Sequence, residues 1–67
     1  MVKLTVNGKP VELENPTPLV AYLRSLGVDP RAVAVEVNER ILERAEFETT
    51  TLAEGDVVEI VRMVGGG

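Results

Sequence analysis

The fold is decided by residues 2–13, VKLTVNGKPVEL, in which two segments of alternating apolar residues flank the dipeptide Asn7-Gly8. Alternation over residues 2–6 is the period of a β-strand with one buried face. Asn and Gly both tolerate positive φ, so Asn7-Gly8 predicts a two-residue type I′ turn into a second strand over residues 9–13. Pro10 has no N–H to donate to a neighbouring strand, which predicts that this second strand lies at a sheet edge.

A helix is predicted to follow the hairpin. Thr17 is expected to be its N-cap and Pro18 its first residue, where the missing proline N–H is not needed. Apolar side chains then recur at i, i+3, i+4 and i+7, which predicts a core-facing stripe of Leu19, Tyr22, Leu23 and Leu26. Gly27 is expected to end the helix in the left-handed conformation.

The middle of the chain predicts a second pair of strands. Residues 28–30, Val-Asp-Pro, predict a turn, and alternation predicts a strand over residues 33–37. The small Ala34 in that strand suggests that its second face is partly covered. Residues 40–42 are expected to form a short strand.

The segment that follows is charged, and residues 43–48 predict a loop or a helical turn from which Phe47 enters the core. The three threonines at 49–51 could be a strand or a loop. The predicted core comprises Leu4, Val6, Leu19, Leu23, Leu26, Val35, Val37, Val58 and Ile60.

The last predicted strand, residues 57–64, has apolar residues on both faces. One face carries Val58, Ile60 and Val64, and the other carries Val57, Val61 and Met63. A single helix covers only one face of a sheet. This strand is therefore either packed on both sides or exposed as a partner interface around Val61, Met63 and Val64.

The sequence ends in Gly65-Gly66-Gly67. Three glycines have no side chains to bury, so we expect a single domain over residues 1–64 and a flexible tail over 65–67. Such a tail could be only a flexible end or a remnant of cloning. Alternatively, it could enter a narrow channel in a partner and bring the Gly67 carboxylate into an active site.

Composition restricts the possible functions. The 67 residues carry a net charge of −4 with seven scattered basic residues, which argues against nucleic-acid binding. The absence of cysteine and histidine removes disulfides, the usual zinc sites and the commonest general base, so we expect no metal, no catalytic residues and no enzyme activity of its own. The longest apolar run, residues 19–23, is too short for a membrane span, and no signal-peptide pattern is visible, which predicts a cytoplasmic location. When free, the chain is expected to be a monomer.

Three segments resemble the ThiS family: VAVEVN (33–38), LAEGD (52–56) and VVEIVRMVGGG (57–67). The resemblance implies an α+β, ubiquitin-like β-grasp fold, with a mixed four- to five-stranded sheet and one main helix on one face. The sequence departs from the family at ILER (41–44), where many members have Ile-Val-Pro-Arg followed by Trp or His. Arg44 matches, Glu43 replaces the proline and Phe47 follows, so this loop could carry partner specificity.

The resemblance implies a sulfur carrier for the thiazole moiety of thiamine. An E1-like, ThiF-type adenylyltransferase would bind ATP and use it to adenylate the Gly67 carboxylate. Without this activation the carboxylate is an anion and a poor electrophile. A donor such as a cysteine desulfurase would supply sulfur, and the resulting thiocarboxylate would pass it to a ThiG-type thiazole synthase. Gly65 and Gly66 would thread into the partner, and the chain would be a co-substrate that binds no cofactor.

Glycine termini on β-grasp chains also occur in the small subunit of molybdopterin synthase, in tRNA-thiolation carriers and in ubiquitin. The alternatives are therefore a carrier for molybdopterin synthesis or tRNA thiolation, a protein modifier joined to lysines, and a non-reactive interaction domain.

Overall fold

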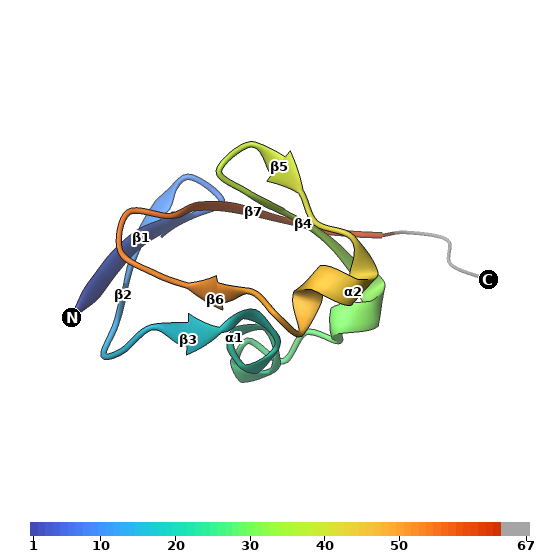
Figure 1. Ribbon diagram of the computed structural model, residues 1–67, viewed down its shortest axis with the longest axis horizontal. Helices are drawn as coiled ribbons and strands as arrows, with labels where there is room; N and C mark the ends of the chain where they lie inside the picture. The colour runs from blue at the N-terminus through green and yellow to red at the C-terminus, as the bar shows by residue number, and fades with distance from the viewer. Residues whose placement is uncertain (64–67) are drawn as a thin grey trace.

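The computed structural model describes residues 1–63, so Val64 and the predicted tail 65–67 lie outside the described residues. The elements, in chain order, are β1 (Val2–Val6), β2 (Lys9–Leu13), β3 (Thr17–Pro18), α1 (Leu19–Ser25), the 3₁₀ turn η1 (Pro30–Ala32), β4 (Val33–Val37), β5 (Arg40–Ile41), α2 (Arg44–Phe47), β6 (Thr51–Leu52) and β7 (Val57–Arg62). Figure 1 shows α1, α2, β3 and β6 together on one side of the larger sheet.

The larger sheet has the strand order β2-β1-β7-β4-β5. β1 pairs in parallel with β7, and every other pair in this sheet is antiparallel. The N-terminal strand therefore lies between its hairpin partner and the last strand, and β2 with Pro10 is at the edge, as predicted. This mixed five-stranded sheet with one main helix confirms the predicted β-grasp fold.

Two type I′-like turns build the hairpins of this sheet. Asn7 and Gly8 have φ values of 51° and 78°, which confirms the predicted turn between β1 and β2. Asn38 and Glu39, with φ values of 52° and 69°, make the corresponding turn between β4 and β5. Each hairpin thus turns within two residues, which pairs β1 with β2 and β4 with β5.

The predicted N-cap at Thr17 is wrong. Thr17 belongs to β3, where it pairs with Leu52, and its hydroxyl donates to the Asn15 carbonyl at 2.9 Å. Pro18 is the residue before the helix, and the first helical N–H, of Leu19, donates to the Thr50 carbonyl at 2.9 Å. A carbonyl from a distant segment therefore takes the place of a side-chain cap. The same pairing places Thr51 in a strand, a question that the sequence left open.

The core lies between the larger sheet and α1. Its buried side chains are almost entirely aliphatic: Val2, Leu4, Val6, Leu19, Tyr22, Leu23, Val33, Val35, Leu42, Phe47, Leu52 and Val58. Phe47 enters the core from α2, as predicted.

The structure changes four of the predictions about burial. Three concern residues predicted to lie in the core, and one concerns the second face of β4. Leu26 is 49% exposed, because α1 ends at Ser25 and the apolar stripe ends with it. Val37 and Ile60 are only partly buried against the core. Ala34 is exposed, so the second face of β4 has no cover within residues 1–63.

Within residues 1–63, neither helix has the length and apolar character needed to cross a bilayer.

Candidate functional site

Strand β7 leads toward the glycine residues and separates its side chains onto two faces. Val58 is fully buried, whereas Val61 on the opposite face is 61% exposed. Of the two possibilities left open by the sequence, the described residues therefore support an exposed apolar surface. Val64, Gly65, Gly66 and Gly67 lie outside the described residues, so their predicted roles stay predictions.

Strand register defines what else lies on this open face of the sheet. Val61 is directly opposite Ala34, and Glu59 is opposite Glu36. On the outer side Glu36 faces Ile41, another exposed apolar residue. We call the exposed apolar residues Ala34, Ile41, Val57 and Val61 the open-face patch.

The point where the described chain ends is held firmly. Met63, which is 50% exposed, follows β7, and its N–H donates to the Ala32 carbonyl at 2.9 Å. β7 itself lies between β1 and β4, so it is hydrogen-bonded on both sides. Near Met63 this support comes from β4, which pairs with β7 through Arg62, whereas β1 pairs only with Val57 and Val58.

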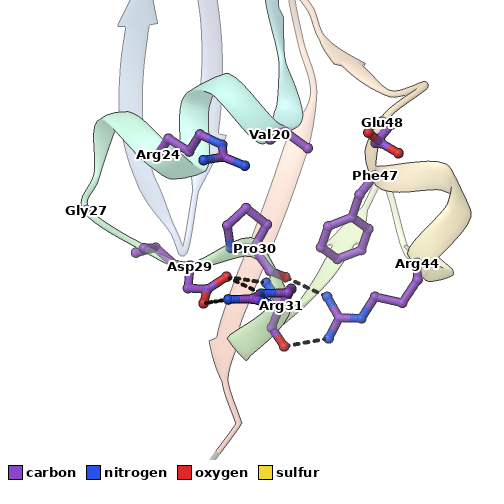
Figure 2. Close-up of a pocket in the computed structure, with 10 residues that line it drawn as sticks. Val20, Arg24, Gly27, Asp29, Pro30, Arg31, Arg44, Phe47 and Glu48 are labelled. Carbon is purple, nitrogen blue, oxygen red and sulfur yellow. Dashed lines mark hydrogen bonds and ion pairs between the residues drawn. The ribbon is translucent and has the colours of Figure 1, made fainter.

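A groove of about 660 Å³ lies between α1, the turn at residues 27–31 and α2 (Figure 2). Its apolar lining comes from Val20, Val28, Pro30 and Phe47. Three arginines, Arg24, Arg31 and Arg44, also line it. An adjoining hollow of about 260 Å³ shares Gly27, Val28 and Asp29 with this groove and is lined further by Arg62 and Met63.

Local hydrogen bonds shape the turn that separates these two hollows. Gly27 has a φ of 75°, and its N–H donates to the Arg24 carbonyl at 2.9 Å, which ends α1 as predicted. Asp29 then accepts from the Arg31 N–H at 2.9 Å and pairs with its guanidinium at 3.2 Å. These hydrogen bonds from the Arg31 side chain and backbone hold the pKa of the Asp29 carboxyl below its ordinary value.

Arg44 ties α2 to the same turn. Its guanidinium donates to the carbonyl oxygens of Pro30 and, at 3.2 Å, Arg31, and it lies 4.9 Å from the centre of the Phe47 ring. The α2 turn also carries a capping box, in which Glu43 and Glu46 satisfy each other's backbone N–H groups. Glu43 thus caps α2, and the Arg44 side chain joins α2 to the turn at residues 30–31.

Sequence reasoning missed this concentration of basic residues. Arg24, Arg31, Arg44 and Arg62 are scattered along the chain and meet only because α1, η1, α2 and the end of β7 converge. The spacing of these arginines carries no signal of that convergence. Within residues 1–63 there is no group of three or more acidic, cysteine or histidine side chains arranged to hold a metal ion.

The known proteins to which this chain is similar agree with one another. The sequence model of the ThiS family matches residues 4–67. The sulfur carrier protein ThiS of Thermus thermophilus is 40% identical over 62 residues, which are 92% of this chain and 95% of that protein. The crystal structure of the thiamine biosynthesis protein ThiS from Geobacter metallireducens has a TM-score of 0.82 and 39% identity, covering 98% of this chain and 100% of that one.

A different kind of relative is a thiazole synthase of Magnetococcus marinus, 38% identical over 66 residues. The match includes 98% of this chain but only 20% of that protein, so this chain spans about a fifth of the length of that relative. The family match over nearly all of the chain, the full-length relative and the shared fold agree, and the chain therefore belongs to the ThiS family.

Proposed function

We propose that this chain is a sulfur carrier protein of thiamine biosynthesis, and that the Gly67 carboxylate carries the sulfur. The observation that supports this most strongly is the family match, which runs through residue 67 and so includes the glycine segment. In this proposal the chain acts in the cytoplasm as a co-substrate, and the nucleotide site and catalytic groups belong to its partners.

The carboxylate must be activated before sulfur can be added. At neutral pH an α-carboxylate is ionised, since its pKa is about 3.5, and it is a poor acyl donor. An E1-like, ThiF-type adenylyltransferase joins it to the AMP part of ATP and releases pyrophosphate. The sulfur of a donor persulfide, supplied by a cysteine desulfurase, then attacks the acyl carbon as AMP leaves. Two electrons from a thiol reductant cleave the S–S bond and leave a thiocarboxylate on Gly67.

This chemistry assigns no reacting side chain to the chain itself. The sequence contains no cysteine, and its two methionines are thioethers, so no side chain can hold a persulfide. Gly65 and Gly66 would supply reach without bulk, so that a partner can admit the end of the chain through a narrow passage. The firmly held exit at Met63 supports a division of labour between a rigid domain and a thin connecting segment.

The acceptor is proposed to be a thiazole synthase. Support comes from the M. marinus relative, a protein called thiazole synthase in which a region similar to this chain forms part of a longer polypeptide. Covalent linkage would place the carrier beside its acceptor, whereas a separate chain must bind it through a surface. The open-face patch together with Met63 is the proposed interface for this binding.

The decisive test combines the purified chain with its cognate adenylyltransferase, ATP, a cysteine desulfurase, cysteine and a thiol reductant. Intact-mass measurement first establishes that the chain ends at Gly67. We expect a mass increase equal to the replacement of one oxygen by sulfur, mapped by peptide analysis to Gly67, and consumption of this product when thiazole synthase and its other substrates are added.

A chain lacking Gly67 is the matched control, because it keeps every described residue. Thiocarboxylate formation on the control, or none on the intact chain with an active partner, would contradict the proposal. A stable link to lysine side chains of other proteins would favour a protein modifier. Sulfur transfer only to molybdopterin synthase or to tRNA would favour a carrier for one of those pathways.

A further inference from the structure

The basic residues of this acidic protein are concentrated in one region. The groove and the adjoining hollow are lined by four of the seven basic side chains, Arg24, Arg31, Arg44 and Arg62, and by two of the eleven acidic ones, Asp29 and Glu48. The region therefore carries a formal side-chain charge of +2 and the remainder of the chain −6, against −4 for the whole. This separation of charge favours binding of a negatively charged partner surface at the groove and the hollow, and disfavours it on the rest of the protein.

Two of these arginines are available to a partner. Arg24 lies in the last turn of α1, its side chain makes no hydrogen bond or ion pair within residues 1–63, and Figure 2 shows that side chain extending from the helix on the groove side. Arg31 is paired with Asp29, but its side chain is 89% exposed, and exposed pairs of this kind contribute little. By contrast, Arg44 is occupied by the carbonyl oxygens of Pro30 and Arg31 and holds the wall in place.

The groove between the arginines has an apolar floor. Val20, Val28 and Pro30 are partly exposed, and the buried Phe47 ring lies beside Arg44. Figure 2 places the acidic Glu48 at the end of the groove remote from Arg31. The region thus suits a peptide segment that combines carboxylates, for the arginines, with an apolar side chain for the floor.

The location of this region relates it to the glycine segment. Met63 and Arg62 line the hollow that adjoins the groove, and the Met63 N–H is bonded to the carbonyl of Ala32, one residue after Arg31. A protein that encloses the residues following Met63 must come close to this basic surface.

We infer that the groove formed by Arg24, Arg31, Val20, Val28 and Pro30 docks an acidic segment of the thiazole synthase that receives the end of this chain. This inference rests on the proposed function and adds to it the chemistry of the partner surface. Docking orients the carrier before its last residues enter the enzyme, and the open-face patch supplies a second contact on the other side of the sheet.

The test measures the dissociation constant between the full chain and its cognate thiazole synthase for three variants. Arg24→Glu reverses the available charge, Arg24→Lys keeps it, and Lys9→Glu makes the same charge change in the hairpin, on a residue that does not line the groove. We expect Arg24→Glu to weaken binding about tenfold in low salt, Arg24→Lys and Lys9→Glu to stay within about threefold of the parent, and the Arg24→Glu effect to shrink at high salt.

Equal effects of Arg24→Glu and Lys9→Glu would overturn the inference, as would no binding of the parent chain to the enzyme. Thermal unfolding monitors each variant, and Arg24→Gln replaces Arg24→Glu if that variant unfolds.

A further check adds ATP alone to the chain and records amide NMR spectra. Shifts confined to residues 24–31 would assign the groove to a nucleotide instead. Thiocarboxylate formation at Gly67 is measured on the same variants. If thiocarboxylate forms normally but Arg24→Glu and Lys9→Glu affect binding equally, only the inference about the groove is rejected. If no thiocarboxylate forms on the parent chain, the proposed function itself is rejected.

Discussion

Asn7 and Ile60 are joined by two hydrogen bonds between the Asn7 side chain and the Ile60 backbone. The Ile60 N–H donates to Asn7 Oδ1 at 2.7 Å, and Asn7 Nδ2 donates to the Ile60 carbonyl at 3.2 Å. The same asparagine occupies the left-handed region in the turn between β1 and β2. A single residue thus completes the hairpin and extends the contact between β1 and β7 beyond the Val6–Val58 pair. Asn38 acts similarly from the other side, where its Oδ1 accepts from the Val57 N–H at 2.9 Å.

Asn7→Gly should separate these two roles, because glycine adopts positive φ freely but cannot bond to Ile60. We expect a loss of about 1 to 2 kcal/mol in the free energy of unfolding, measured by chemical denaturation. Asn7→Ala should lose about 1 kcal/mol more, since alanine also strains the turn. Equal stabilities of Asn7→Gly and the parent would mean that the side-chain bonds contribute nothing.

Two leucines of α1 should respond very differently to truncation. Leu23 is fully buried, so Leu23→Ala should cost about 2 to 5 kcal/mol of unfolding free energy. Leu26 is exposed beyond the end of α1, so Leu26→Ala should change stability by less than about 0.5 kcal/mol. Denaturant unfolding of the two variants side by side tests this, and similar losses would contradict the assigned end of the helix.

Acid should weaken the turn at Asp29. The pKa of this carboxyl is lower in the folded protein than in the unfolded chain, because it accepts hydrogen bonds from the Arg31 side chain and backbone. Its stabilising contribution is therefore present above the unfolded pKa, about 3.9, and is lost as pH falls through the folded value.

NMR titration of the Asp29 carboxyl should show a midpoint below the ordinary value, and Arg31→Ala should move that midpoint upward. In Asp29→Asn the fall in stability below about pH 4 should be shallower than in the parent. An ordinary midpoint in the folded chain would refute the interaction.

Met63→Asp should weaken binding to thiazole synthase about tenfold while leaving the domain folded, because it places a charge in the interface proposed for that enzyme. Met63 lies beyond the end of β7 and is half exposed, so the fold does not depend on its burial. Ala21→Asp, an exposed change on α1, adds the same charge away from this surface and should bind normally. Unfolding of Met63→Asp would assign Met63 to the core instead.

Gly66→Val should abolish thiocarboxylate formation at Gly67, because the proposed passage in the activating enzyme has no room for a branched side chain. The buried core lies within residues 2–58, so thermal unfolding of this variant should match that of the parent. Intact-mass measurement after incubation with the adenylyltransferase, ATP and the sulfur donor provides the readout. Normal modification of Gly66→Val would show that the passage is wide.

The sequence by itself determined several features that depend on neighbours along the chain. Positive φ at Asn7-Gly8, period-two alternation in β1 and β4, the helical repeat that begins at Leu19 and the left-handed Gly27 are local properties, and all were predictable. The two-sided apolar pattern of β7 was equally visible, but whether its second face is covered depends on which segments pack there. Only the tertiary structure shows Val61 exposed.

Features that depend on distant segments required the fold. Thr17 has the side chain of an N-cap, yet the Thr50 carbonyl bonds the first helical N–H, since a backbone acceptor brought by β3–β6 pairing satisfies that donor directly. Leu26 continues the helical period, but the chain leaves the helix one residue before it. The basic groove is the clearest case, because Arg24, Arg31 and Arg44 become neighbours only when packing of the core brings α1, η1 and α2 together.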